Sequence, residues 1–159
     1  MDFIIPQGGS SVCEINVEPL PPGNSKAQPW KMTNVTAKPP VEVDTLDMIF
    51  SKNSSKAERQ IEKMVLVFSI PPSSNAGGYN WRFFGDGLMY CDGKEDYLDR
   101  ISPAISNNGK TLTLTVSCLG DQAEDFAFSF LAIRQDKVSG ECQIFSSEDP
   151  GGSTNRGGN

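Results

Sequence analysis

The sequence predicts an all-β protein, built as an antiparallel β-sandwich with at most one short helix. The composition is rich in turn formers, with 15 glycines and 11 prolines in 159 residues, as all-β proteins tend to be. About seven or eight short segments with strand patterns are separated by turn-rich loops, without the strand–helix alternation of a parallel sheet. We expect one domain over residues 1–150 and a disordered tail over residues 151–159, because GGSTNRGGN has no apolar side chain to anchor it.

The clearest strand is NGKTLTLTVSCL, residues 108–119. Leu112, Leu114, Val116 and Cys118 alternate there with threonines and a serine, so one face is apolar and the other is a row of hydroxyls. We expect the apolar face in the core and the hydroxyl row in water. Two further segments predict strands: VCEINVE, residues 12–18, alternates in the same way, and MVLVFSI, residues 64–70, is apolar on both faces as in a central strand.

The remaining segments are assigned from prolines, glycine turns and a helix-capping pattern. Six prolines between residues 19 and 40 predict a long loop or edge segment. Ser55 and Glu58 form a capping-box pattern, which predicts a short helix in SSKAERQIEKM. Residues 79–93 predict a strand, a glycine turn and another strand, and residues 94–106 a polar loop.

The charge and the cysteines indicate an acidic cytoplasmic protein. The net charge of -6 and the pI near 4.6 argue against nucleic acid and membrane surfaces as partners, because no cluster of Lys and Arg is present. The N-terminal segment has no export signal, so we expect a cytoplasmic location. Cys13, Cys118 and Cys142 alternate with apolar neighbours and are expected in the core as free thiols, with two disulfides as the alternative.

Catalysis is not expected. The chain contains no histidine, which removes serine and cysteine triads and the commonest metal ligand. The acidic loop CDGKEDYLDR offers Glu95 beside two aspartates for glycoside hydrolysis. Asp92, Asp96 and Asp99, with Asp86 nearby, offer oxygen ligands for calcium, but their spacing does not follow a calcium loop. No cofactor is predicted.

GGYNWRFFGDG, residues 77–87, is the best candidate for a binding site. Tyr79, Trp81, Arg82 and Asp86 combine flat apolar faces with hydrogen-bonding groups, which carbohydrates and partner proteins both use. The alternative is a core strand, since Tyr79, Trp81 and Phe83 share one face, and rows of large aromatic residues are more often buried.

Two resemblances refine the fold and the family. AEDFAFSF, residues 123–130, resembles the corner between strands E and F of immunoglobulin domains, which implies an immunoglobulin-like arrangement. SPAISNNGKTLTLT, FAFSF and SSEDPGG, over roughly residues 101–150, resemble the DP-EP family of small bacterial proteins, with Asp149 and Pro150 as the Asp-Pro motif. That resemblance implies a bacterial protein but no activity.

The function predicted from these observations is a non-catalytic bacterial module for protein binding or self-association. The alternative is binding of carbohydrate or another small ligand through the Tyr79–Asp86 region.

Overall fold

The computed structural model describes residues 2–24, 26–90, 100–148 and 150–157, and it confirms a mostly β protein. Its strands form three sheets. The six-stranded sheet has the order β4(Val41–Val43), β3(Lys31–Asn34), β2(Ser10–Glu18), β6(Lys63–Ser69), β9(Thr111–Val116), β8(Ile101–Ser106). The four-stranded sheet has the order β1(Asp2–Ile4), β5(Leu46–Phe50), β13(Gly152–Arg156), β10(Glu124–Phe126). The three-stranded sheet has the order β12(Cys142–Ser146), β11(Phe128–Asp136), β7(Tyr79–Tyr90).

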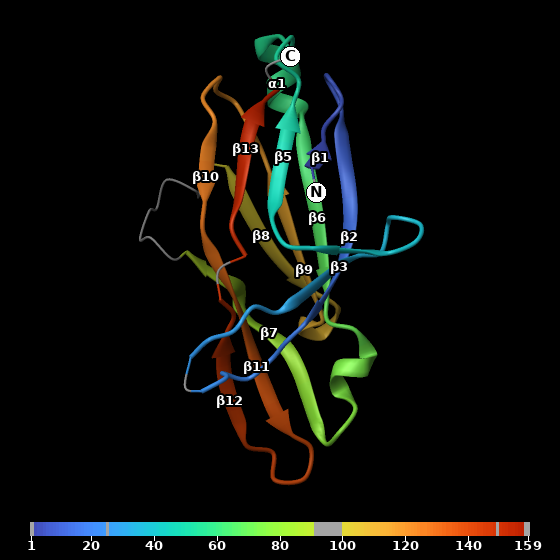
Figure 1. Ribbon diagram of the computed structural model, residues 1–159, viewed down its shortest axis with the longest axis vertical. Coiled ribbons are helices and arrows are strands. Elements are labelled where there is room, and N and C mark those ends of the chain that lie inside the picture. The colour runs from blue at the N-terminus through green and yellow to red at the C-terminus, as the bar shows by residue number, and fades with distance from the viewer. Residues whose placement is uncertain (1, 25, 91–99, 149, 158–159) are drawn as a thin grey trace.

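The sheets enclose one hydrophobic core. In Figure 1 the four-stranded sheet lies in front of β6, β8 and β9, and the three-stranded sheet extends below them. Side chains from all three sheets join a single buried cluster. Phe130 lies at its centre, where its ring stacks on Trp30 at 6.1 Å and meets Phe68 edge to face at 5.0 Å.

The patterned strands lie where the sequence predicts them. β6 is central, between β2 and β9. Along β9 the leucines and Val116 are buried, as is Cys118 just beyond it, while the threonines alternate with them on the half-exposed face. The single α-helix in the described residues, α1(Lys56–Ile61), begins at the predicted capping box, in which Ser55 Oγ accepts from the Glu58 N–H and the Glu58 carboxylate accepts from the Ser55 N–H. Two 3₁₀ turns accompany it, η1(Pro72–Asn75) and η3(Asn107–Gly109).

Strand direction differs from the prediction. The pairs β1·β5, β5·β13 and β2·β6 are parallel, so the sheets are mixed and a wholly antiparallel arrangement is wrong. The physical reason is that the period of two in a sequence specifies which face a side chain occupies but not which way the neighbouring strand runs.

The predicted disordered tail is wrong for residues 152–156. These residues form β13, which pairs in parallel with β5 and antiparallel with β10. Backbone hydrogen bonds on both sides and the buried Arg156 side chain hold the strand without apolar residues.

Two further segments differ from the prediction. β7 is one strand instead of a strand–turn–strand, because residues 84–87 bulge out between the pairs Phe83–Ala132 and Leu88–Phe130. Residues 101–106, predicted as loop, form β8, whose Pro103 is tolerated because β8 is an edge strand.

Candidate functional site

The four residues of the predicted ligand site do not converge. Trp81 is 5% exposed and lies in the core, with its ring 6.3 Å from Trp30 and 5.6 Å from Phe145. Tyr79 lies at the rim of the core, 36% exposed, with the Arg134 guanidinium 4.2 Å from its ring centroid. Trp81 is therefore closed to a ligand, as the core interpretation of this strand predicts.

Arg82 and Asp86 lie apart from these rings. Arg82 occupies the opposite face of β7, where its side chain covers Gly109 so closely that a Cβ there would lie 2.9 Å from the Arg82 Cβ. Asp86 is exposed in the bulge. Tyr79 lines a pocket of about 280 Å³. The other lining residues are Arg134, Asp136, Glu141 and Gln143.

The predicted metal ligands Asp92, Asp96 and Asp99 lie outside the described residues, as does Glu95. Among the residues that are described, no group of three or more Asp, Glu or Cys side chains is placed to hold a metal ion. No helix in the described part of the chain is long and apolar enough to cross a membrane.

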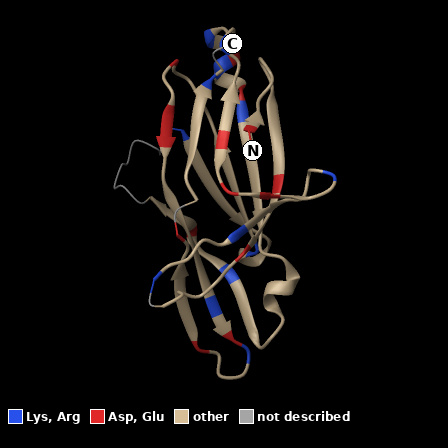
Figure 2. Ribbon diagram, viewed as in Figure 1, with Lys and Arg blue, Asp and Glu red and all other residues tan. Residues whose placement is uncertain are grey.

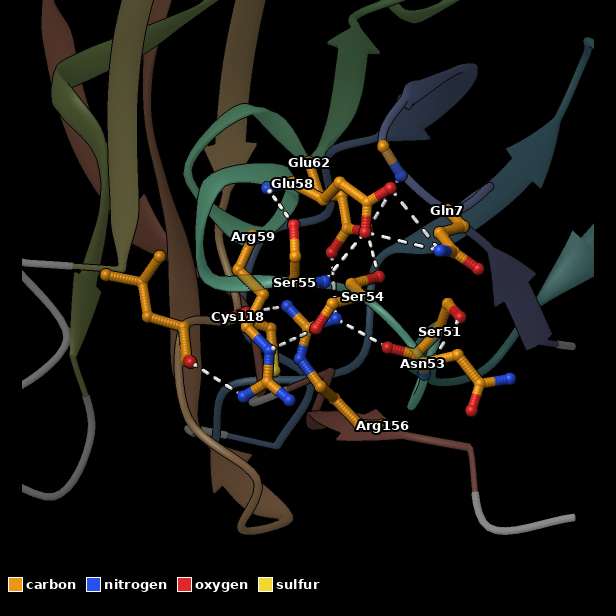
Figure 3. Close-up of polar contacts among 12 residues, drawn as sticks. Gln7, Ser51, Asn53, Ser54, Ser55, Glu58, Arg59, Glu62, Cys118 and Arg156 are labelled. Carbon is orange, nitrogen blue, oxygen red and sulfur yellow. Dashed lines mark hydrogen bonds and ion pairs between the residues drawn. The ribbon is translucent and has the colours of Figure 1, made fainter.

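The most buried charges form an ion pair between the helix and the C-terminal strand (Figure 3). Arg156 Nη1 lies 2.8 Å from Glu62 Oε2, with side chains 2% and 0% exposed. Arg156 also donates to the carbonyl oxygens of Ser51 and Cys118. The carboxylate of Glu62 accepts from Ser54 Oγ and from the Gly8 N–H.

This ion pair has a structural role: it holds the C-terminal strand against the helix. Burial alone would raise the pKa of Glu62, but the hydrogen bonds from Ser54 and Gly8, together with the Arg156 guanidinium, hold that pKa below its usual value. Glu62 is therefore charged at neutral pH. The pair anchors β13 to the end of α1.

The outer face of the three-stranded sheet carries exposed apolar side chains that the sequence did not indicate. Ile144 on β12 is 52% exposed and pairs across the ladder with Ile133, which is half-buried. Phe84 follows the buried Phe83 in the bulge and is 40% exposed. Met89 pairs with Ser129 on the same face and is 46% exposed. We call Phe84, Met89, Ile133 and Ile144 the outer apolar face.

Cys142 belongs to the same side of β12 and is exposed, so its predicted place in the core is wrong. The alternation of Cys142 with Ile144 is real, but β12 is an edge strand and these side chains point outward. Cys13 and Cys118 are buried free thiols, as predicted.

β12 is also an open edge over Cys142–Ser146, and just beyond it the Glu148 N–H donates to the Gln28 carbonyl at 2.9 Å. Edge strands of native sheets are usually protected by shortness, charge, proline or a covering segment. β1, β4 and β10 have three residues each, and β8 contains Pro103. The edge of β7 is covered by η1, since Asn75 Oδ1 accepts from the Trp81 N–H at 2.9 Å. β12 has five residues, CQIFS, with neither charge nor proline, and Figure 2 shows it without a charged segment.

Comparison with known proteins gives the family. The sequence model of the DP-EP family matches residues 11–156. The chain belongs to the DP-EP family. The match extends well beyond the C-terminal half that carries the resemblance. No curated protein matches the chain.

The Asp-Pro motif of this DP-EP protein is described only at its proline, because Asp149 lies outside the described residues. Pro150 lines a pocket of about 440 Å³ whose apolar lining includes Trp30, Met32 and Phe130. Pro150 lies two residues before β13, between the three-stranded sheet of β12 and the four-stranded sheet of β13.

Proposed function

We propose that this DP-EP protein is a non-catalytic association module whose outer apolar face binds a second copy of the chain. The observation that carries the proposal is the exposure of Met89 and Ile144 on the outer face of the three-stranded sheet, with Phe84 exposed in the neighbouring bulge. Burial of apolar surface drives most protein association, and contiguous exposed apolar side chains mark such surfaces. The bacterial cytoplasm and an immunoglobulin-like scaffold, both expected from the sequence, are parts of the same proposal.

The test is the mass of the full-length protein in solution, measured by sedimentation over a wide range of concentration. The parent is expected to form a dimer as concentration rises. Ile144→Lys places a hydrated charge in the contact, so it is expected to remain monomeric with an unchanged circular dichroism spectrum.

Ile61→Lys is the matched control, because Ile61 is also an exposed isoleucine, 60% exposed, but lies on α1. It is expected to associate as the parent does. A parent that stays monomeric at every concentration overturns self-association. If Ile144→Lys and Ile61→Lys weaken association equally, the effect comes from the added charge and not from the outer apolar face.

Binding of carbohydrate or another small ligand is the second candidate. Its support is the pocket beside Tyr79, where Arg134 Nη2 donates to Gln143 Oε1 at 3.0 Å and Glu141 lies nearby. A calorimetric titration with neutral oligosaccharides is expected to show binding that Tyr79→Ala abolishes, and heats equal to dilution would refute this candidate.

A further inference from the structure

The backbone N–H and C=O groups of β12 point in two directions, toward β11 and away from it. At one end of the β11–β12 ladder the Asp136 N–H donates to the Glu141 carbonyl at 2.9 Å, and at the other the Ser147 N–H donates to the Phe130 carbonyl at 3.0 Å. Peptide groups alternate in direction along a strand. Residues 141, 143, 145 and 147 therefore bond to β11, while Cys142, Ile144 and Ser146 direct their N–H and C=O groups away from it.

No strand of the described structure receives these outward groups, because β12 ends its sheet. The outward set is symmetric about Ile144, with one member two residues to either side. An antiparallel copy of β12 related by a two-fold axis at Ile144 satisfies all of them. Ile144 then exchanges both bonds with Ile144 of the second copy, and Cys142 does so with Ser146 of the second copy.

The side chains favour a second copy as the occupant. β12 carries no charge, so the two-fold axis brings no like charges face to face, and the flanking Glu141 falls opposite Ser147 of the second copy. The paired Ile144 side chains join the two outer apolar faces, each backed by Ile133. Strand pairing thus brings the two Ile144 side chains into a cross-strand contact and satisfies the open edge at the same time.

We infer that two copies of the chain associate by antiparallel pairing of their β12 strands about a two-fold axis at Ile144, which forms one continuous sheet with three strands from each copy. The inference rests on the proposed self-association and names its geometry.

Disulfide trapping tests this register. Opposed residues of a hydrogen-bonded antiparallel pair have Cα atoms about 5.5 Å apart, within the range of about 4.4–6.8 Å that a disulfide spans. In full-length protein carrying Cys142→Ser, the added change Ile144→Cys is expected to give a covalent dimer on mild oxidation. Gln143→Cys in the same background faces Phe145 of the second copy and is expected to stay monomeric, as is Cys142→Ser alone.

A second trap leaves Ile144 intact. Ser146→Cys in the otherwise native chain places the introduced thiol opposite Cys142 of the second copy, so oxidation is expected to give a dimer with two disulfides, counted by intact mass. Because Ser146→Cys keeps Ile144, it still tests the register if Ile144→Cys weakens association.

The outcomes separate the two proposals. Trapping through position 143 but not 144 or 146 overturns the two-fold axis at Ile144. Absence of trapping at 144 and 146 in a parent whose mass still rises with concentration overturns strand pairing but leaves self-association standing. A parent that is monomeric throughout overturns both.

Discussion

The buried ion pair offers a sharp test of how the C-terminal strand is held. Arg156→Met removes the guanidinium and leaves the Glu62 carboxylate, which is 0% exposed, without its counter-charge. Removal of one partner from a buried pair costs about 3–5 kcal/mol, because the remaining charge is uncompensated. The carbonyl oxygens of Ser51 and Cys118 also lose a charged donor. We therefore expect a loss of about 3–5 kcal/mol in the free energy of unfolding.

The assay is equilibrium unfolding in urea, followed by the fluorescence of Trp30 and Trp81, which are both buried. The matched control is Asp121→Ala, which breaks an ion pair of similar length, 2.7 Å, whose aspartate is 76% exposed. Exposed pairs contribute little, so the control is expected to change stability by less than about 1 kcal/mol. If Arg156→Met lowers the free energy of unfolding by less than about 1 kcal/mol, the ion pair does not hold the C-terminal strand in place.

The same pair predicts an acid dependence of stability. The folded-state pKa of Glu62 lies below its ordinary value of 4.5, so the unfolded state binds more protons in acid. The stabilisation is present above pH 4.5 and is lost as the pH falls through the folded-state pKa. Glu62→Gln should therefore lose less stability than the parent between neutral pH and acid; equal losses, measured by urea unfolding at each pH, would show that Glu62 does not contribute.

Two further predictions concern the sheets and the thiols. Leu114→Ala is expected to destabilise by about 2–5 kcal/mol, through lost burial and the cavity left behind, whereas Thr113→Lys on the half-exposed face should change stability by less than about 1 kcal/mol; similar losses in urea unfolding would contradict the assigned faces. In the native protein a thiol reagent should modify exposed Cys142 rapidly but buried Cys13 and Cys118 only after unfolding, since burial raises the pKa of both thiols. Mass spectrometry of the modified peptides checks this, and labelling of Cys118 before unfolding would contradict its burial in the core.

The strands that the sequence predicts are those whose side chains alone decide their place. β9 alternates leucine with threonine, so burial of its leucine face explains its place. β6 is apolar along its length and is central, although only alternate residues of it are fully buried. α1 is signalled by Ser55 and Glu58, because the capping box is a local hydrogen-bond pattern.

The sequence could not predict what depends on distant partners. β13 has no apolar residue, and it is a strand because β5 and β10 bond to its backbone and Glu62 pairs with Arg156. Whether Cys142 and Ile144 face the core or water depends on β12 being an edge, which is a property of topology. The open edge of β12 could not be predicted for the same reason, since it also depends on the order of strands in the sheet.

The most direct test of the central claim is amide hydrogen exchange along β12, measured by NMR at low and high protein concentration. The Ile144 N–H points away from β11, so we predict rapid exchange in dilute protein and strong protection in concentrated protein. The Gln143 N–H bonds to β11 and should be protected at both concentrations. Exchange at Ile144 that does not change with concentration, while the mass doubles, would contradict association through this edge.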